Sequence, residues 1–99
     1  SVSGITKAKG FQGVVKRHGF AGGRASHGGK HDLRKGGSIG PTFPEHVIKG
    51  RRMAGRMGAD RFTVKNLVVA FVDEEKGILG GRGIVPSVTG RIVEIRSAK

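Results

Sequence analysis

The chain has 99 residues, which is enough for one small domain or part of one. It carries 19 Lys and Arg against 7 Asp and Glu, a formal charge of +12, with 19 glycines and no Cys, Trp or Tyr. The lack of Cys excludes disulfides and cysteine-ligated zinc, and no run of about 18 apolar residues is available to span a membrane. We also expect no secretory signal, since no charged-then-apolar leader is visible. The charge predicts a polyanionic partner, with nucleic acid ahead of an anionic membrane surface.

The first predicted element is a strand at Phe11–Val15, within a segment 1–15 that leads into the sheet. Residues 16–61 follow and show no helical or strand period. Residues 1–61 hold 13 Lys and Arg against 3 Asp and Glu, together with 14 of the 19 glycines and all four His. A structureless stretch of this length indicates either disorder or support from outside the chain. Glycine allows close backbone approach and Lys/Arg supply phosphate contacts, so we interpret 16–61 as an extension that threads into folded nucleic acid.

Residues 62–99 are close to neutral and have the composition of β-structure. Residues 62–72 predict a strand that alternates at first and is apolar on both faces from Leu67 to Val72, as in a buried strand. Turns are expected at 73–77, with Gly77 suited to positive φ, and at 86–90. Short apolar pieces lie between these turns, and a last strand is expected at 91–96. The predicted fold class is therefore mainly β, with too few strands to close a core.

The histidine and glycine motifs of the chain do not match a metal site or a catalytic motif. His27 and His31 are four residues apart, but two intervening glycines disfavour a helix and no further ligand completes a metal site. The GSIG segment at 37–40 is not a G-x-S-x-G elbow, and neither a dinucleotide fingerprint nor a P-loop occurs. We therefore predict no enzyme activity, no cofactor, no metal and no small-molecule substrate.

The aromatic and methionine side chains have mostly structural interpretations. Phe11, Phe62 and Phe71 fall in strand patterns and are expected in the core, and Met53 and Met57 are expected to pack inward. Phe20 and Phe43 lie in the basic stretch instead, where packing on a base or ribose is the alternative.

Several motifs, taken in order, resemble one family. They are KGFQGVVKRHGF at 9–20, SHG at 26–28, GSIG at 37–40, KGRRMAGRMG at 49–58, VKNL at 64–67 and Val85-Pro86. In order and spacing they resemble the bacterial type of the large-subunit ribosomal protein three family, the universal L-three family. The resemblance covers essentially the whole chain and corresponds to a C-terminal portion of the family, which is about twice this length.

The resemblance implies a translation-factor-like β-barrel, of which 1–15 and 62–99 would form part, and a long irregular glycine-rich basic extension at 16–61. It further implies a structural role in which the extension binds 23S-type ribosomal RNA, supports assembly and approaches the peptidyl transferase centre through residues 38–43. Neighbouring large-subunit proteins are the other implied partners, on a cytoplasmic ribosome, with an organellar ribosome as the alternative location. The chain departs from the family at Pro41, where many members carry a methylated Gln, and at Gly80-Gly81, which we expect to break a strand.

The predicted RNA contacts are the basic residues of the extension, because guanidinium and ammonium groups bind phosphate oxygens. They are Lys16, Arg17, His18, Arg24, His27, Lys30, Arg34, Lys35, Lys49, Arg51, Arg52 and Arg56. Two other interpretations remain open. A disordered, generic nucleic-acid chaperone is disfavoured by the apolar strands, and a membrane-active cationic protein is disfavoured because the glycine spacing forbids a long amphipathic helix.

Overall fold

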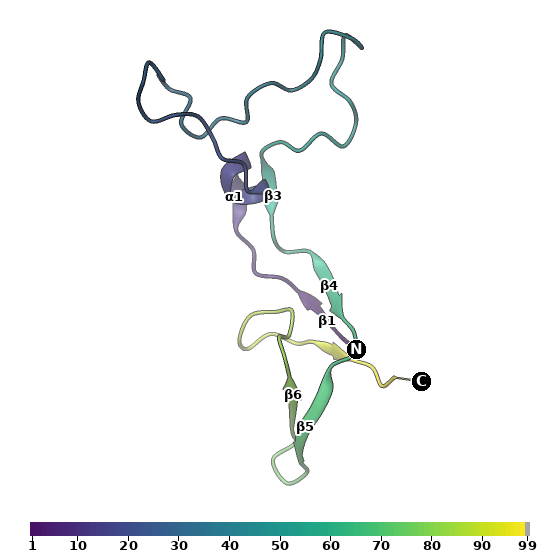
Figure 1. Ribbon diagram of the computed structural model, residues 1–99. Coiled ribbons are helices and arrows are strands. Elements are labelled where there is room, and N and C mark those ends of the chain that lie inside the picture. Colours follow the sequence, from purple (N-terminus) through teal and green to yellow (C-terminus); the bar gives the residue numbers. More distant parts are fainter. Residues whose placement is uncertain (99) are drawn as a thin grey trace. The chain divides into compact units, whose positions relative to one another are not determined.

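A computed structural model of the protein describes residues 1–98 (Figure 1). The elements in chain order are β1 (Val2–Ile5), β2 (Gly10–Gln12), α1 (Val14–His18), β3 (Gly55–Met57), β4 (Arg61–Val64), β5 (Val68–Asp73), β6 (Ile78–Arg82) and β7 (Glu94–Ile95). The expectation of a mainly β chain is confirmed, since α1 is the one helix among the described residues. Residues 1–98 contain no closed barrel; their strands form one sheet of three strands and two sheets of two.

The chain divides into two compact units. The strand unit comprises Ser1–Ala8 and Gly58–Lys99, and the basic unit comprises Lys9–Met57. The strand unit contains β1, β4, β5, β6 and β7, and the basic unit contains β2, α1 and β3. Each is described by itself below.

The strand unit is organised around β1, which pairs antiparallel with β4 on one side and β7 on the other. Ser3 lies opposite Thr63, and their hydroxyl oxygens are 2.7 Å apart. The Ser1 amine donates to the Arg96 carbonyl at 2.7 Å, and the Arg96 amide donates back to Ser1 at 2.9 Å, which extends the β1–β7 ladder. The polar Ser3–Thr63 pair occupies one face of β1, so Val2 and Gly4 occupy the other.

The core of the strand unit is small and centres on Val2, which is 9% exposed. Gly4 and Pro86 are also buried there. A Cβ added to Gly4 would overlap the carbonyl oxygen of Pro86 and would lie 3.1 Å from a methyl group of Val93. Glycine is therefore required at position 4 because the Pro86 backbone crosses β1 at van der Waals contact.

A hairpin of β5 and β6 forms the second part of the strand unit (Figure 1). Its turn is the one predicted at 73–77: the Asp73 carboxylate accepts from the Lys76 amide at 3.2 Å, and Gly77 has φ 64°. The expectation that Gly80-Gly81 breaks a strand is wrong, because β6 runs through both glycines. Phe71 lies opposite Gly80, and its ring occupies the place of a side chain there, as aromatic residues do opposite strand glycines.

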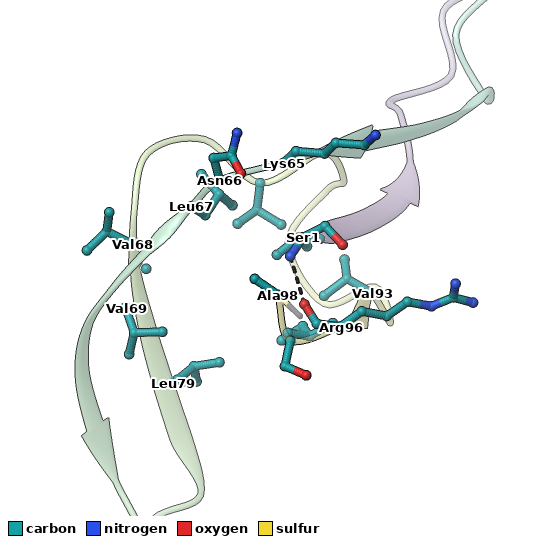
Figure 2. Close-up of a pocket in the computed structure, with 15 residues that line it drawn as sticks. Ser1, Lys65, Asn66, Leu67, Val68, Val69, Leu79, Val93, Arg96 and Ala98 are labelled. Carbon is teal, nitrogen blue, oxygen red and sulfur yellow. Dashed lines mark hydrogen bonds between the residues drawn. The ribbon is translucent and has the colours of Figure 1, made fainter.

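An open apolar groove of about 630 Å³ lies in the strand unit (Figure 2). Figure 2 shows side chains of the β5–β6 hairpin, Val69 and Leu79 among them, lying on one side and Val93 and Ala98 on the other. The groove is lined mainly by aliphatic groups, which remain in contact with solvent. This unit therefore presents an apolar surface that the described residues do not cover.

Several sequence-based expectations about strands are corrected by the structure. Phe11–Val15 is not one strand, since β2 ends at Gln12 and Val14 and Val15 belong to α1. Residues 62–72 are divided at Asn66, which has φ 59°, into β4 and β5. The last strand is shorter than predicted and covers only Glu94–Ile95.

Burial is also corrected. The expected core residues Phe11, Phe62 and Phe71 are 76%, 57% and 59% exposed. Met53 is also exposed, whereas Met57 on β3 is partly buried. The strand β5, predicted to be buried on both faces, is exposed from Val68 to Val72. The reason is physical: a two-stranded sheet has no second layer to cover it within this unit.

Candidate nucleic-acid interface

The two units differ in charge, although both are basic. The basic unit holds eleven Lys and Arg against two Asp and Glu, a net charge of +9, and all four His. The strand unit holds eight Lys and Arg against five Asp and Glu, a net charge of +3. Every residue predicted to contact RNA lies in the basic unit, so the candidate interface belongs to that unit.

The interface begins at α1, which carries Lys16, Arg17 and His18 in its last turn. The helix ends because Gly19 adopts the left-handed conformation, with φ 72°. The Gly19 amide donates to Val15 at 3.0 Å and the Phe20 amide donates to Val14 at 3.4 Å, which is a Schellman motif. Basic residues followed by glycine are a helix-stop signal, and here this signal outweighs the strand preference of Val14 and Val15.

Two of these helix residues bind the segment that precedes β3. Arg17 donates from a terminal guanidinium nitrogen to the Met53 carbonyl at 2.6 Å, and His18 Nε2 lies 2.9 Å from the same oxygen. β2 and β3 pair antiparallel nearby, with Phe11 opposite Arg56. The Met53 carbonyl is therefore an anchor point that the side-chain pattern of the sequence did not reveal. Arg17 and His18 have a structural contact within the chain, and Lys16 extends outward.

Beyond α1 the backbone forms a first irregular loop, closed at its base by backbone hydrogen bonds. The Gly23 amide lies 3.1 Å from the Asp32 carbonyl and 3.0 Å from the Leu33 carbonyl. Within this closed loop Arg24, His27 and Lys30 are exposed, and Arg34 is exposed just outside it. His27 has φ 58°, so it belongs to a turn and not to a helix. Lys35 is also exposed and forms an ion pair with Asp32 at 3.3 Å.

A second irregular loop contains Lys49, Arg51 and Arg52. The Arg51 guanidinium donates to the Ser38 carbonyl at 2.8 Å and so joins the two sides of this loop. The Arg51 amide donates to Ile48 at 3.3 Å and closes a turn. Lys49 and Arg52 flank Arg51 and are exposed.

The predicted contact residues therefore fall into two groups. Arg17, His18, Lys35 and Arg51 contact other residues of the chain. Another seven are exposed or partly exposed, and their side chains make no hydrogen bond or ion pair with other residues in 1–98: Lys16, Arg24, His27, Lys30, Arg34, Lys49 and Arg52. Arg56 lies exposed on β3 and has an interaction of its own. The second group is the one whose charges are available for phosphate oxygens.

Across residues 1–98, no group of three or more His, Asp or Glu side chains is placed to hold a metal ion. No helix in the described part of the chain has the length and apolar character needed to cross a membrane. The pKa of Glu94, in the strand unit, is lowered by its hydrogen bond from Arg61 and then by Arg96.

Comparison with known proteins identifies the family. The family described as Ribosomal protein L3 matches residues 1–81. The chain is 57% identical over 98 residues to the large ribosomal subunit protein uL3 of Clavibacter michiganensis, covering 98% of the chain and 45% of that relative. It is 48% identical to the uL3 protein of Borrelia turicatae, covering 99% of the chain and 47% of that relative. The chain thus spans about half the length of these curated relatives and corresponds to a C-terminal portion of them.

The match covers both units, because residues 1–81 include the whole basic unit and most strands of the strand unit. The family consists of structural proteins and not of enzymes. From the family match and the identity to its curated relatives it follows that this chain belongs to the ribosomal protein L3 family.

Proposed function

We propose that the protein is a structural constituent of the large ribosomal subunit in the bacterial cytoplasm, and that it binds 23S-type ribosomal RNA through the basic unit. Curated relatives carry the name of large ribosomal subunit protein uL3, which supports the subunit assignment. The observation that carries RNA binding is the charge of the basic unit, +9 with only two acidic residues. A surface with so few neutralising acids matches a phosphate backbone.

The two groups of basic residues have different roles in the proposed binding. Arg17, His18 and Arg51 hold the second irregular loop and the segment that precedes β3 through backbone carbonyls, and backbone hydrogen bonds of Gly23 close the first loop. The unpartnered cations then present ammonium and guanidinium groups along those loops, where they neutralise phosphates of crowded RNA helices. Residues 38–43 would lie nearest the peptidyl transferase centre, and neighbouring ribosomal proteins would contact the remaining surface.

Crosslinking of purified large subunits that contain this chain tests the proposal. Sites joined to Arg24, Lys30, Arg34 and Lys35 are mapped on the RNA. We expect them to cluster in 23S-type RNA close to the peptidyl transferase centre. Crosslinks scattered over the RNA would point to a generic nucleic-acid chaperone, and absence of the chain from assembled subunits would contradict the proposal.

We also propose that the strand unit is part of a translation-factor-like β-barrel whose core includes the apolar groove. The exposed aliphatic faces of β5 and β6 and the small core around Val2 support this. The relatives are about twice as long and so have further sequence to complete such a core. A polypeptide carrying the remaining part of the Clavibacter relative is expected to bind this chain and protect the β5 amides from exchange. Unchanged exchange would contradict the barrel.

A further inference from the structure

A second cleft, unrelated to the apolar groove of the strand unit, lies within the basic unit. Its volume is about 480 Å³, within the range of small-ligand sites. Phe20 forms one wall, residues 39–41 a second, and residues 48–52 a third. Phe20 was noted in the sequence as a residue that could pack on a base, but it was not among the predicted RNA contacts.

The wall formed by Phe20 is held by several contacts. The amide of Phe20 closes the Schellman motif on Val14, so the residue is fixed directly to the end of α1. The His18 ring lies 5.9 Å from the Phe20 ring at an interplanar angle of 39°. His18 is in turn anchored at the Met53 carbonyl. The ring of Phe20 is therefore a positioned aromatic surface and not a freely moving side chain.

The opposite walls are joined by the hydrogen bond from Arg51 to the Ser38 carbonyl. This bond ties the segment before Ile39 to the turn that contains Ile48. Both isoleucines line the cleft and remain more than half exposed, at 54% and 57%. The cleft is thus bounded by apolar groups on more than one side, and those groups remain in contact with water.

The rim of the same cleft is cationic. Lys49 and Arg52 line it, and their side chains have no ion pair or hydrogen bond with other residues in the described part of the chain. None of the residues that line the cleft is acidic. A ligand that contacts both the apolar walls and the cationic rim has a flat apolar portion joined to an anionic group. A free phosphate would leave the apolar walls uncovered, and an apolar peptide would leave two cations uncompensated.

We propose that this cleft binds one unstacked nucleobase of single-stranded RNA, which packs on Phe20 while Lys49 and Arg52 contact its flanking phosphates. The inference rests on the proposed binding of ribosomal RNA by the basic unit and names the part of that RNA which this cleft selects. Single-stranded nucleotides are the form of RNA whose bases stack on aromatic side chains, because bases within a duplex are already stacked.

The experiment uses the full chain and a transcript of 23S-type ribosomal RNA in which 4-thiouridine replaces a small fraction of uridine. After irradiation, crosslinked peptides are identified by mass spectrometry. We expect crosslinks at Phe20 and within residues 48–52. The affinity for the unmodified transcript is measured in parallel as a function of salt, for the natural chain and for the variants below.

Phe20→Leu is expected to weaken binding about 5- to 150-fold, the range found when a base loses its aromatic partner. The slope of affinity against salt is expected to stay unchanged, because no phosphate contact is removed. Phe20→Trp retains a stacking surface and is expected to restore affinity. Lys49→Gln is expected to lower the slope by about 0.7 for a single-stranded contact. Phe11→Leu is the matched control, since Phe11 is an exposed aromatic residue of the same unit that does not line this cleft and is not among the predicted RNA contacts.

The outcomes separate the two proposals. Saturable, salt-dependent binding that Phe20→Leu leaves unchanged would overturn the base-binding cleft while leaving ribosomal RNA binding intact. Equal losses for Phe20→Leu and Phe11→Leu would also overturn it, because any aromatic residue of the unit would then serve. Absence of saturable binding by the natural chain would overturn both.

Discussion

The strand unit and the basic unit hold their backbones in different ways. In the strand unit, β1 pairs on both sides, and Gly4 lies against the Pro86 backbone. In the basic unit, residues 19–54 contain no helix or strand, and the loops are closed by a few hydrogen bonds to backbone carbonyls. The backbone of the sheet is therefore held mainly by hydrogen bonds and packing within the chain. The backbone of the loops is held only at the anchor points, and the cations of the loops remain available to an external partner.

The largest expected difference between the two units is the loss of RNA affinity when their cations are replaced. Replacing Arg24, Lys30 and Arg34 together by Ala removes three cations of the basic unit whose side chains have no hydrogen bond or ion pair with other residues in 1–98. At a salt slope of about −0.9 per phosphate contact, each lost contact weakens binding about eightfold at 0.1 M salt, so the triple variant should bind about 10²- to 10³-fold more weakly. Titration against 23S-type RNA at several salt concentrations measures both the affinity and the slope.

The matched control for this triple variant lies in the strand unit. Replacing Lys65, Lys76 and Arg82 by Ala removes the same formal charge from exposed positions. We expect a much smaller loss of affinity, because only long-range, screened attraction is removed. Equal losses in the two triple variants would show that RNA responds to net charge alone and that the basic unit is not the interface.

The next effect concerns the stability of the strand unit. Gly4→Ala forces a methyl group against the Pro86 carbonyl, and overpacking of this kind costs about 1–3 kcal/mol. Amide exchange in β1 and β4 is expected to accelerate accordingly, while exchange around α1 stays unchanged. Gly81→Ala is the control, since its nearest atom would be 3.9 Å away. Accelerated exchange in both units would contradict their independence.

The sequence predicts the broad division well and the packing poorly. Charge and glycine frequency distinguish the basic segment, and the turn at 73–77 with Gly77 follows from local residue preferences. The helix α1 was missed because Val14 and Val15 favour strands, whereas the deciding feature is the αL glycine after them. Burial was overestimated at Phe62 and Phe71 because a pattern does not tell whether a covering layer belongs to the same chain.

The candidate site was predictable in composition but not in geometry. All the predicted basic residues lie in one unit, as their clustering along the chain implies. The anchor at the Met53 carbonyl involves a backbone atom, which carries no side-chain signal. The sequence alone does not distinguish Arg17, which binds the Met53 carbonyl, from Lys16, which is available to a ligand.

A moderate effect is expected at the end of α1. Gly19→Ala places a Cβ in the left-handed conformation, at a cost of about 1–2 kcal/mol. The amides of α1 and Phe20 should exchange faster, since the Schellman hydrogen bonds depend on this conformation, while β1 should be unaffected. Gly19→Asn is the control, because Asn tolerates this conformation better and should lose less. An equal loss for Ala and Asn would mean that conformation at residue 19 does not determine the helix end.

The smallest effect concerns a paired carboxylate of the strand unit. Glu94 accepts from Arg61 at 2.6 Å and from Arg96 at 2.5 Å, and these contacts lower its pKa below the ordinary value of 4.5. A pKa that is lower in the folded state adds stability above pH 4.5, and this contribution is lost as the pH falls through the folded-state pKa. The contribution is small because the three side chains are exposed.

Arg61→Gln removes the hydrogen bond with the largest effect and should raise the pKa of Glu94 toward 4.5, as followed by NMR titration of its carboxyl carbon. Lys65→Gln removes another cation of the strand unit that does not act on Glu94 and should leave its titration unchanged. The same result in both variants would show that general positive charge, and not pairing, lowers this pKa. The pairing matters for the comparison of the units, since a cation engaged by Glu94 is less available to phosphate than Lys49 or Arg52, whose side chains have no such partner in the described residues.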